Sequence, residues 1–119
     1  MRILLIGDQS IQNDAVKSIL SSEVSREIWQ VTHAQVQEGV AKTKKYLVSI
    51  VDLISSPKNP VEYVQDIYEQ KLSKYLIALH TFSYNEIEEA LHDAGADYCL
   101  SIDSNPNKLV QLISRLDHK

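Results

Sequence analysis

Two aspartates in this chain follow short apolar runs and have the chemistry for metal or phosphoryl binding. Asp8 comes after the apolar run 3–6 and one glycine, and Asp52 ends the nearly all-apolar run 46–51. Two neighbouring carboxylates, with water and loop carbonyl oxygens, form a hard oxygen site suited to Mg²⁺. A carboxylate can also attack a phosphoryl group while a metal neutralises the transferring oxygens. The alternative is structural: Asp8 caps the next helix and Asp52 orders the loop after its strand.

Apolar runs that alternate with helical spacing predict the elements that position these aspartates. Strands are expected over residues 3–6, 28–31, 46–51, 75–79 and 97–101. Helices are expected over about 11–21, around 36–40, from 60 to 72, from 83 or 85 to a glycine stop at 94–96, and from 104–106 to 116.

This strict alternation is typical of an α/β fold, a doubly wound (βα)5 parallel sheet. The run 46–51 is apolar on both faces, as expected for a strand in the middle of such a sheet. Right-handed crossovers leave few topologies, and the flavodoxin-like strand order 2-1-3-4-5 is the commonest for five units. The first and third strands are then neighbours at the switch point. Asp8 and Asp52 are therefore expected to meet in one crevice.

Composition excludes several classes of protein. The 119 residues are expected to form a single domain, 1–119, with ordinary apolar (44%) and charged (24%) fractions. The net charge of −4 argues against nucleic-acid binding, and the one basic cluster, Lys42, Lys44 and Lys45, reads as a solvated helix end. A lone cysteine, Cys99, excludes an internal disulfide. The first apolar run is too short for a signal peptide or membrane span, so we expect a cytoplasmic protein.

Four segments resemble, in order and spacing, those of a CheY-like response-regulator receiver domain: residues 3–8, 46–53, 76–80 and 94–98. The resemblance implies that Asp52 is the phosphoacceptor position. It also implies that Asp8 is the second member of an acidic pair that holds Mg²⁺, and that the backbone carbonyl of Ile54 completes the metal set. Such domains are signalling modules of two-component (phosphorelay) systems rather than enzymes. They commonly precede a DNA-binding output domain in transcription regulators.

Four positions depart from the family pattern and predict an atypical receiver with a degenerate phosphorylation site. Gly7 stands where the first acidic residue of the pair is expected, and Ile102 stands where a phosphate-facing lysine is expected. His80 replaces the hydroxyl residue after the fourth strand, and Cys99 replaces the aromatic switch residue of the fifth. Losing one positioned charge-assisted contact costs roughly 1.5–3 kcal/mol. Phosphorylation of Asp52 is therefore expected to be weak or absent.

We therefore expect a regulatory module that acts by contact with another protein or with a second copy of itself. The domain should bind neither nucleic acid nor membrane, and it should require no cofactor beyond weak Mg²⁺ binding. A dimer is expected to use the fourth helix, whose segment 86–93 is acidic, the fifth strand and the last helix, where Val110 borders the apolar stripe.

Three alternative functions remain open beside this hypothesis. The first is a conventional Mg²⁺-dependent receiver phosphorylated on Asp52, in which a protonated His80 would partly replace the lost cation. The second is a metal-dependent phosphatase, which is disfavoured because Ser10 stands where its second aspartate is expected. The third is a flavodoxin-like nucleotide module, disfavoured because residues 7–10 contain a single glycine. Cys99 is interpreted as a small buried apolar group rather than a redox thiol.

Overall fold

The computed structural model describes residues 2–8, 11–23, 27–39, 45–54, 56–81, 85–101 and 106–117. In this part of the chain the strands are β1 (Arg2–Ile6), β2 (Glu27–Val31), β3 (Tyr46–Asp52), β4 (Ser73–His80) and β5 (Tyr98–Ser101). The helices are α1 (Ile11–Glu23), α2 (His33–Gln37), α3 (Pro60–Gln70), α4 (Asn85–Ala94) and α5 (Pro106–Asp117). The strands pair in parallel in the order β2-β1-β3-β4-β5. The predicted fold class and strand order are confirmed.

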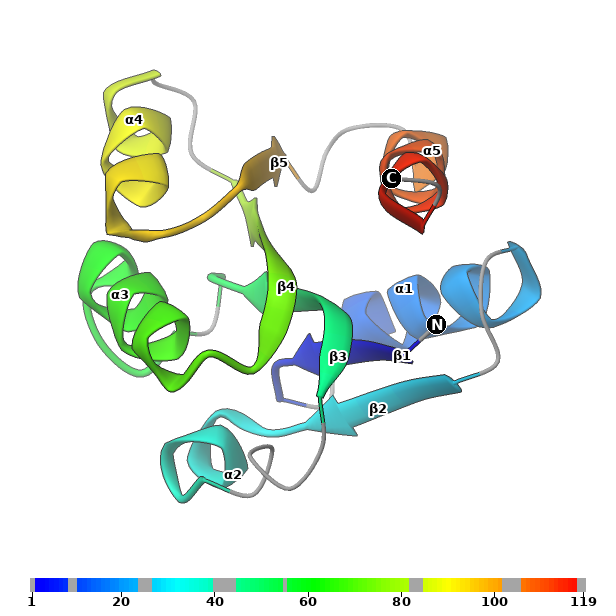
Figure 1. Cartoon of the computed structure of the whole chain (residues 1–119), viewed down its shortest axis with the longest axis horizontal. Helices are drawn as coiled ribbons and strands as arrows, with labels where there is room; N and C mark the ends of the chain where they lie inside the picture. Colours follow the sequence, from blue (N-terminus) through cyan, green and yellow to red (C-terminus); the bar gives the residue numbers. More distant parts are fainter. Residues whose placement is uncertain are drawn as a thin grey trace.

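Helices cover both faces of the sheet (Figure 1), with α2, α3 and α4 on one side and α1 and α5 on the other. Successive strand residues point to opposite faces, so each inner strand supplies both cores. The core under α3 and α4 takes Leu4, Ile6, Val51, Leu76 and Ala78. The core under α1 and α5 takes Ile3, Leu5, Val48, Ile50 and Ile77. Burial on both faces explains why β3 reads as a continuous apolar run.

Helical spacing of apolar residues predicts a buried stripe of Ala15, Val16, Ile19 and Leu20 on helix α1, and the structure differs at one of them. Leu20 is buried and Val16 and Ile19 are half-buried, but Ala15 is exposed. The position fully buried at the other end of the helix belongs to a polar residue, Asn13. The buried face of α1 therefore includes a polar residue, Asn13.

Helix α2 begins earlier than expected and is short. Thr32 caps it: the Thr32 side chain accepts a hydrogen bond from the Gln35 backbone N–H, and the Gln35 side chain accepts one from the Thr32 N–H. This reciprocal capping box fixes the start of the helix at His33. Gly39 has a positive φ of 83° just after the helix, and Val40, the predicted end of the apolar stripe, lies outside the described residues.

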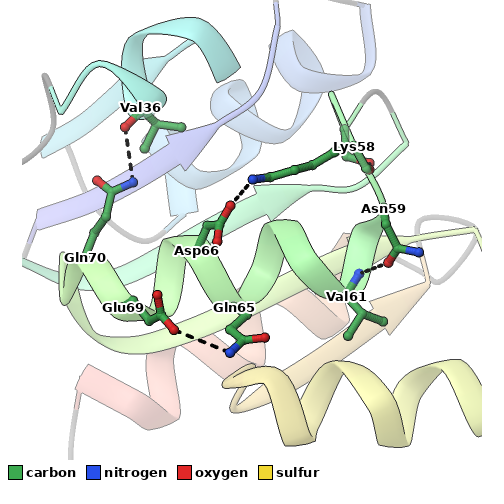
Figure 2. Close-up of polar contacts among 9 residues, drawn as sticks. Val36, Lys58, Asn59, Val61, Gln65, Asp66, Glu69 and Gln70 are labelled. Carbon is green, nitrogen blue, oxygen red and sulfur yellow. Dashed lines mark hydrogen bonds and ion pairs between the residues drawn. The ribbon is translucent and has the colours of Figure 1, made fainter.

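Helix α3 begins as predicted, with Pro60 in its first turn and Asn59 as its cap (Figure 2). The Asn59 side-chain oxygen accepts a hydrogen bond from the backbone N–H of Val61 at 2.9 Å. Leu72, predicted to be part of this helix, lies beyond its end and is buried before β4. The buried face of the helix includes Tyr63, which the predicted stripe omitted.

Gly95 ends α4 at a place where only glycine fits. Its φ is +126°, and a Cβ there would lie 2.3–2.6 Å from Cγ, Cδ1 and Cβ of Tyr68 on α3. Such distances are far inside van der Waals contact, so the Tyr68 side chain packs directly on the Gly95 backbone. This contact joins the ends of two neighbouring helices. None of the described helices is long and apolar enough to cross a membrane.

Candidate functional site

Asp8 and Asp52 lie at the carboxyl ends of the neighbouring strands β1 and β3, as predicted. Asp52 is the last residue of β3, paired in register with Leu79 of β4, rather than the first residue beyond the strand. The side-chain amide of Asn13 on α1 joins the two aspartates. Its Nδ2 group donates to the backbone oxygen of Asp8 at 2.7 Å and to Oδ2 of Asp52 at 3.2 Å. The two aspartates therefore lie at one corner of the fold, with Asp52 buried and Asp8 exposed.

The remaining carboxylate contacts are with backbone N–H groups. Oδ1 of Asp52 accepts a hydrogen bond from Ile54 N at 2.9 Å, so Asp52 orders the loop that follows its strand. Oδ1 of Asp8 accepts one from His33 N at 3.2 Å. Asp8 thus holds the first residue of α2, whereas the structural alternative had it capping α1. Asp52 is 4% exposed, and the Asp8 side chain lies at the surface.

Gly7 is a glycine because the site has no room for a side chain at that position. A Cβ on Gly7 would lie 2.7 Å from Nδ2 of Asn13, 3.0 Å from Cβ of Asp52 and 3.3 Å from Oδ2 of Asp52. The first of these distances is shorter than real Cβ atoms show, so Asn13 would have to move. The acidic residue that the receiver pattern places here is excluded by the packing of Asn13 and Asp52.

A buried His33–Tyr63 pair borders this corner. His33 Nδ1 lies 2.5 Å from the Tyr63 hydroxyl, and the two rings meet edge to face with centroids 5.1 Å apart. Burial lowers the pKa of His33 below its ordinary value of 6.5, and the charges of Asp8 and Asp52 oppose part of that shift. Burial, with the same two charges, raises the pKa of Tyr63 above 10.0. The pair therefore joins a neutral imidazole to a protonated phenol.

His80 is buried at the end of β4 and faces α4. Its Nε2 atom lies 2.9 Å from Oε2 of Glu88. The sequence had placed Glu88 on the solvent-facing side of α4, but this contact turns it toward the sheet. The pair ties the end of β4 to the first turn of α4.

Cys99 and Tyr98 point to opposite faces of the sheet, as predicted, each packing against a different core. Burial, with a smaller contribution from the charge of Glu88, raises the pKa of the Cys99 thiol from 9.0 to about 11. Cys99 is thus a poor nucleophile at neutral pH. Ile102, the fourth departure from the receiver pattern, lies outside the described residues.

Lys58, a cation in the loop after β3, is directed along α3. It forms an ion pair with Asp66 (Figure 2). On the same helix Gln70 donates to the backbone oxygen of Val36, which ties the end of α3 to α2 at 3.2 Å. Lys58 therefore neutralises a carboxylate of α3, the helix that follows its loop.

The donor set around Asp8 and Asp52 does not fit Mg²⁺. Mg²⁺ requires oxygen ligands in near-octahedral geometry at about 2.0–2.1 Å. Here N–H groups of Asn13, Ile54 and His33 point at the oxygens that a cation would use. Among the described residues, no group of three or more His, Cys, Asp or Glu side chains is placed to hold a metal ion.

The predicted site lacks Asn13, His33 and Tyr63, although the sequence positions of Asn13 and His33 pointed to it. Asn13 precedes Val16 by three residues and Leu20 by seven, so helical spacing places it on the buried face. His33 follows the carboxyl end of β2 as Asp8 follows that of β1. In a parallel sheet such positions share one edge, where binding sites occur. Polar residues at every strand end belong in the set of site candidates.

No protein-family model matches the chain, and no curated protein matches it. Solved structures do match. The signal receiver domain of a DNA-binding response regulator from Colwellia psychrerythraea is 18% identical, with 100% of this chain and 99% of that chain covered and a TM-score of 0.85. Chemotaxis protein CheY4 of Vibrio cholerae is 21% identical, with 98% of each chain covered and a TM-score of 0.78.

A third similar structure is the receiver domain of a sensor histidine kinase from Pseudomonas aeruginosa, which has a magnesium ion coordinated in its active-site cleft. It is 18% identical, with 99% of this chain and 98% of that chain covered and a TM-score of 0.79. At these identities the likeness concerns the fold. The chain has the CheY-like receiver fold over its whole length.

Proposed function

We propose that this chain is an atypical receiver domain in two-component-type signal transduction, with weak or absent phosphorylation of Asp52. In this proposal the domain acts by contact with another protein or with a second copy of itself. One observation carries it: Asp52, at the end of the central strand of a CheY-like fold, is buried and bonded to the N–H groups of Asn13 and Ile54. A typical receiver would need that carboxylate for a phosphoryl group and a metal.

The physical argument concerns charge and access. A carboxylate that attacks a phosphoryl group needs a free oxygen and a cation to neutralise the transferring oxygens. Oδ2 of Asp52 is covered by the Asn13 amide, and the nearby loop cation, Lys58, is paired with Asp66. His80, at the position expected to sense a phosphoryl group, contacts Glu88. Asp52, the phosphoacceptor position, and His80, the position expected to sense phosphorylation, are therefore both held by other contacts.

Intact-mass measurement after treatment with a small acyl phosphate and Mg²⁺ tests the proposal. We expect no stoichiometric adduct of about 80 Da, the mass of one phosphoryl group. Asp52→Asn should behave like the wild type, and so should Asp93→Asn, a control at an exposed carboxylate of α4. A full adduct in the wild type and in Asp93→Asn that is absent from Asp52→Asn would identify a conventional phospho-accepting receiver instead. The proposal also holds that the chain is not an enzyme, so a generic aryl phosphate should not be hydrolysed.

For the contact surface we propose the face formed by α4, β5 and α5, with a second copy of the chain as the partner. Strand β5 is an edge strand whose four residues are only partly buried. A cavity of about 330 Å³ lies beside it, lined in part by Tyr98 and Leu100 of β5 and Leu112 of α5. The flanking helices carry opposite charges: Glu86, Glu89 and Asp93 are exposed on α4, and Lys108 and Arg115 on α5. A two-fold dimer would bring acidic α4 against basic α5 twice.

Sedimentation of charge-reversal variants tests this surface. The double variant Lys108→Glu/Arg115→Glu should weaken self-association by roughly tenfold or more, because like charges then face each other across the interface. Lys17→Glu, the same kind of change at an exposed residue of α1, outside the proposed surface, should leave self-association unchanged. A wild type that stays monomeric at all concentrations would contradict the dimer.

A further inference from the structure

The side-chain amide of Asn13 fills the space between the two aspartates of the site. Asn13 is fully buried, and its Nδ2 group lies 2.7 Å from the backbone oxygen of Asp8 and 3.2 Å from Oδ2 of Asp52. An amide nitrogen carries two N–H donors, and here they reach oxygens on two different segments. One neutral group therefore joins the end of β1, helix α1 and the end of β3.

The space for this amide exists because residue 7 has no side chain. A Cβ at Gly7 would lie 2.7 Å from the same Nδ2 atom and 3.0 Å from Cβ of Asp52. No positive φ is recorded for Gly7, whereas Gly39 and Gly95 both have one, so Gly7 is required by space rather than by backbone conformation. Gly7 and Asn13 are thus two halves of one arrangement: a side chain at residue 7 and the amide of Asn13 exclude each other.

Two further carboxylate contacts at this corner are also hydrogen bonds from N–H groups. Oδ1 of Asp52 faces the N–H of Ile54, and Oδ1 of Asp8 faces the N–H of His33. These hydrogen bonds occupy carboxylate lone pairs that a hard cation could otherwise bind. The corner is therefore built to satisfy carboxylates with hydrogen-bond donors.

We propose that the Asn13 amide is an internal substitute for a metal ion: it occupies the cation position of this site and holds Asp52 in place without Mg²⁺. This inference rests on the proposed function, because it explains how a receiver-like corner is held together when phosphorylation is not its task.

Exchanging the amide for a carboxylate tests the proposal directly. Asn13→Asp keeps the size of the side chain but replaces the donor with an oxygen that faces Asp52 Oδ2 and the Asp8 carbonyl. We expect this variant to melt below the wild type in EDTA, to regain stability with Mg²⁺, and to bind one Mg²⁺ per chain by calorimetry at least about tenfold more tightly than the wild type. Gln111→Glu, the same chemical change on exposed α5, should show no Mg²⁺ response.

A second pair of variants decides the matter if Asn13→Asp does not fold. Gly7→Asp/Asn13→Ala should bind Mg²⁺ at least about tenfold more tightly than Gly7→Asp, in which the Asn13 amide and the new side chain compete for the same space. Circular dichroism should show that both are folded.

Equal Mg²⁺ affinity of the two Gly7 variants, or a folded Gly7→Asp/Asn13→Ala chain without affinity, would overturn the role of Asn13. So would a wild type that binds Mg²⁺ as tightly as Asn13→Asp. These failures differ from failure of the proposed function, which the Asp52 adduct reports. A wild type that binds Mg²⁺ but takes no phosphoryl group would remove this inference alone.

Discussion

Replacing Tyr63 with Phe isolates the hydrogen bond between the two buried rings beside the site. The change removes only the hydroxyl oxygen, 2.5 Å from His33 Nδ1, and leaves the ring in the core under α3. The edge-to-face contact of the rings, at an interplanar angle of 68°, is retained. A buried polar group that loses its partner costs about 1–3 kcal/mol. We expect the free energy of unfolding to fall by that amount, a large part of the roughly 5–15 kcal/mol that holds a typical domain folded.

The measurement is equilibrium urea unfolding near pH 8, where His33 is neutral in the folded and unfolded chains. Tyr68→Phe is the matched control, because it makes the same chemical change on the same helix at a ring that is 56% exposed. It should lie within about 0.5 kcal/mol of the wild type. If Tyr63→Phe is no less stable than Tyr68→Phe, the short contact contributes nothing to stability and the reasoning about the buried pair is wrong.

Three further predictions concern other parts of the structure. Burial lowers the pKa of His33 below 6.5, so neutral His33 contributes fully to stability above pH 6.5, and this contribution is lost as the pH falls through the lowered pKa of the folded chain. The difference in unfolding free energy between the wild type and His33→Asn should therefore shrink on acidification. Gly95→Ala should cost at least about 2 kcal/mol in urea unfolding, since φ is +126° and the new methyl group would overlap Tyr68; a near-neutral change would contradict the packing. Cys99, with its thiol pKa raised to about 11, should react with a disulfide reagent at neutral pH far more slowly in the native chain than in denaturant, and equal rates would contradict its burial.

The architecture could be predicted from the sequence because it depends on patterns that one strand or helix carries by itself. The continuous apolar run of β3 indicates a strand buried on two faces, and the alternation of elements leaves few topologies. The start of α3 was equally readable, since Asn59 and Pro60 are local capping signals. Asp8 and Asp52 could be brought together for the same reason: strand order alone puts them at one edge.

The detail of the site could not be predicted, because it depends on contacts between residues far apart in the chain. Asn13 and Asp52 are 39 residues apart, and His33 and Tyr63 are 30 apart. The sequence shows that Gly7 is not acidic, but only the packing shows that an acidic side chain would not fit. Glu88 likewise points toward the sheet because it pairs with His80. This tertiary contact could not be predicted from the position of Glu88 on the polar face of its helix.

The packing of Tyr68 on Gly95 has a mechanical consequence for any partner that binds the side of the molecule formed by α2, α3 and α4. The Tyr68 side chain packs so closely on the Gly95 backbone that no space is left between them. The C-terminal turn of α4 therefore cannot shift along α3 unless the Tyr68 side chain moves as well. A protein that binds α4 and displaces it would thus displace α3 as well, and the same end of α3 is hydrogen-bonded to α2 through Gln70. Helices α2, α3 and α4 on this face would therefore move together as one unit. Helices α1 and α5 lie on the opposite side of the sheet and take no part in these contacts.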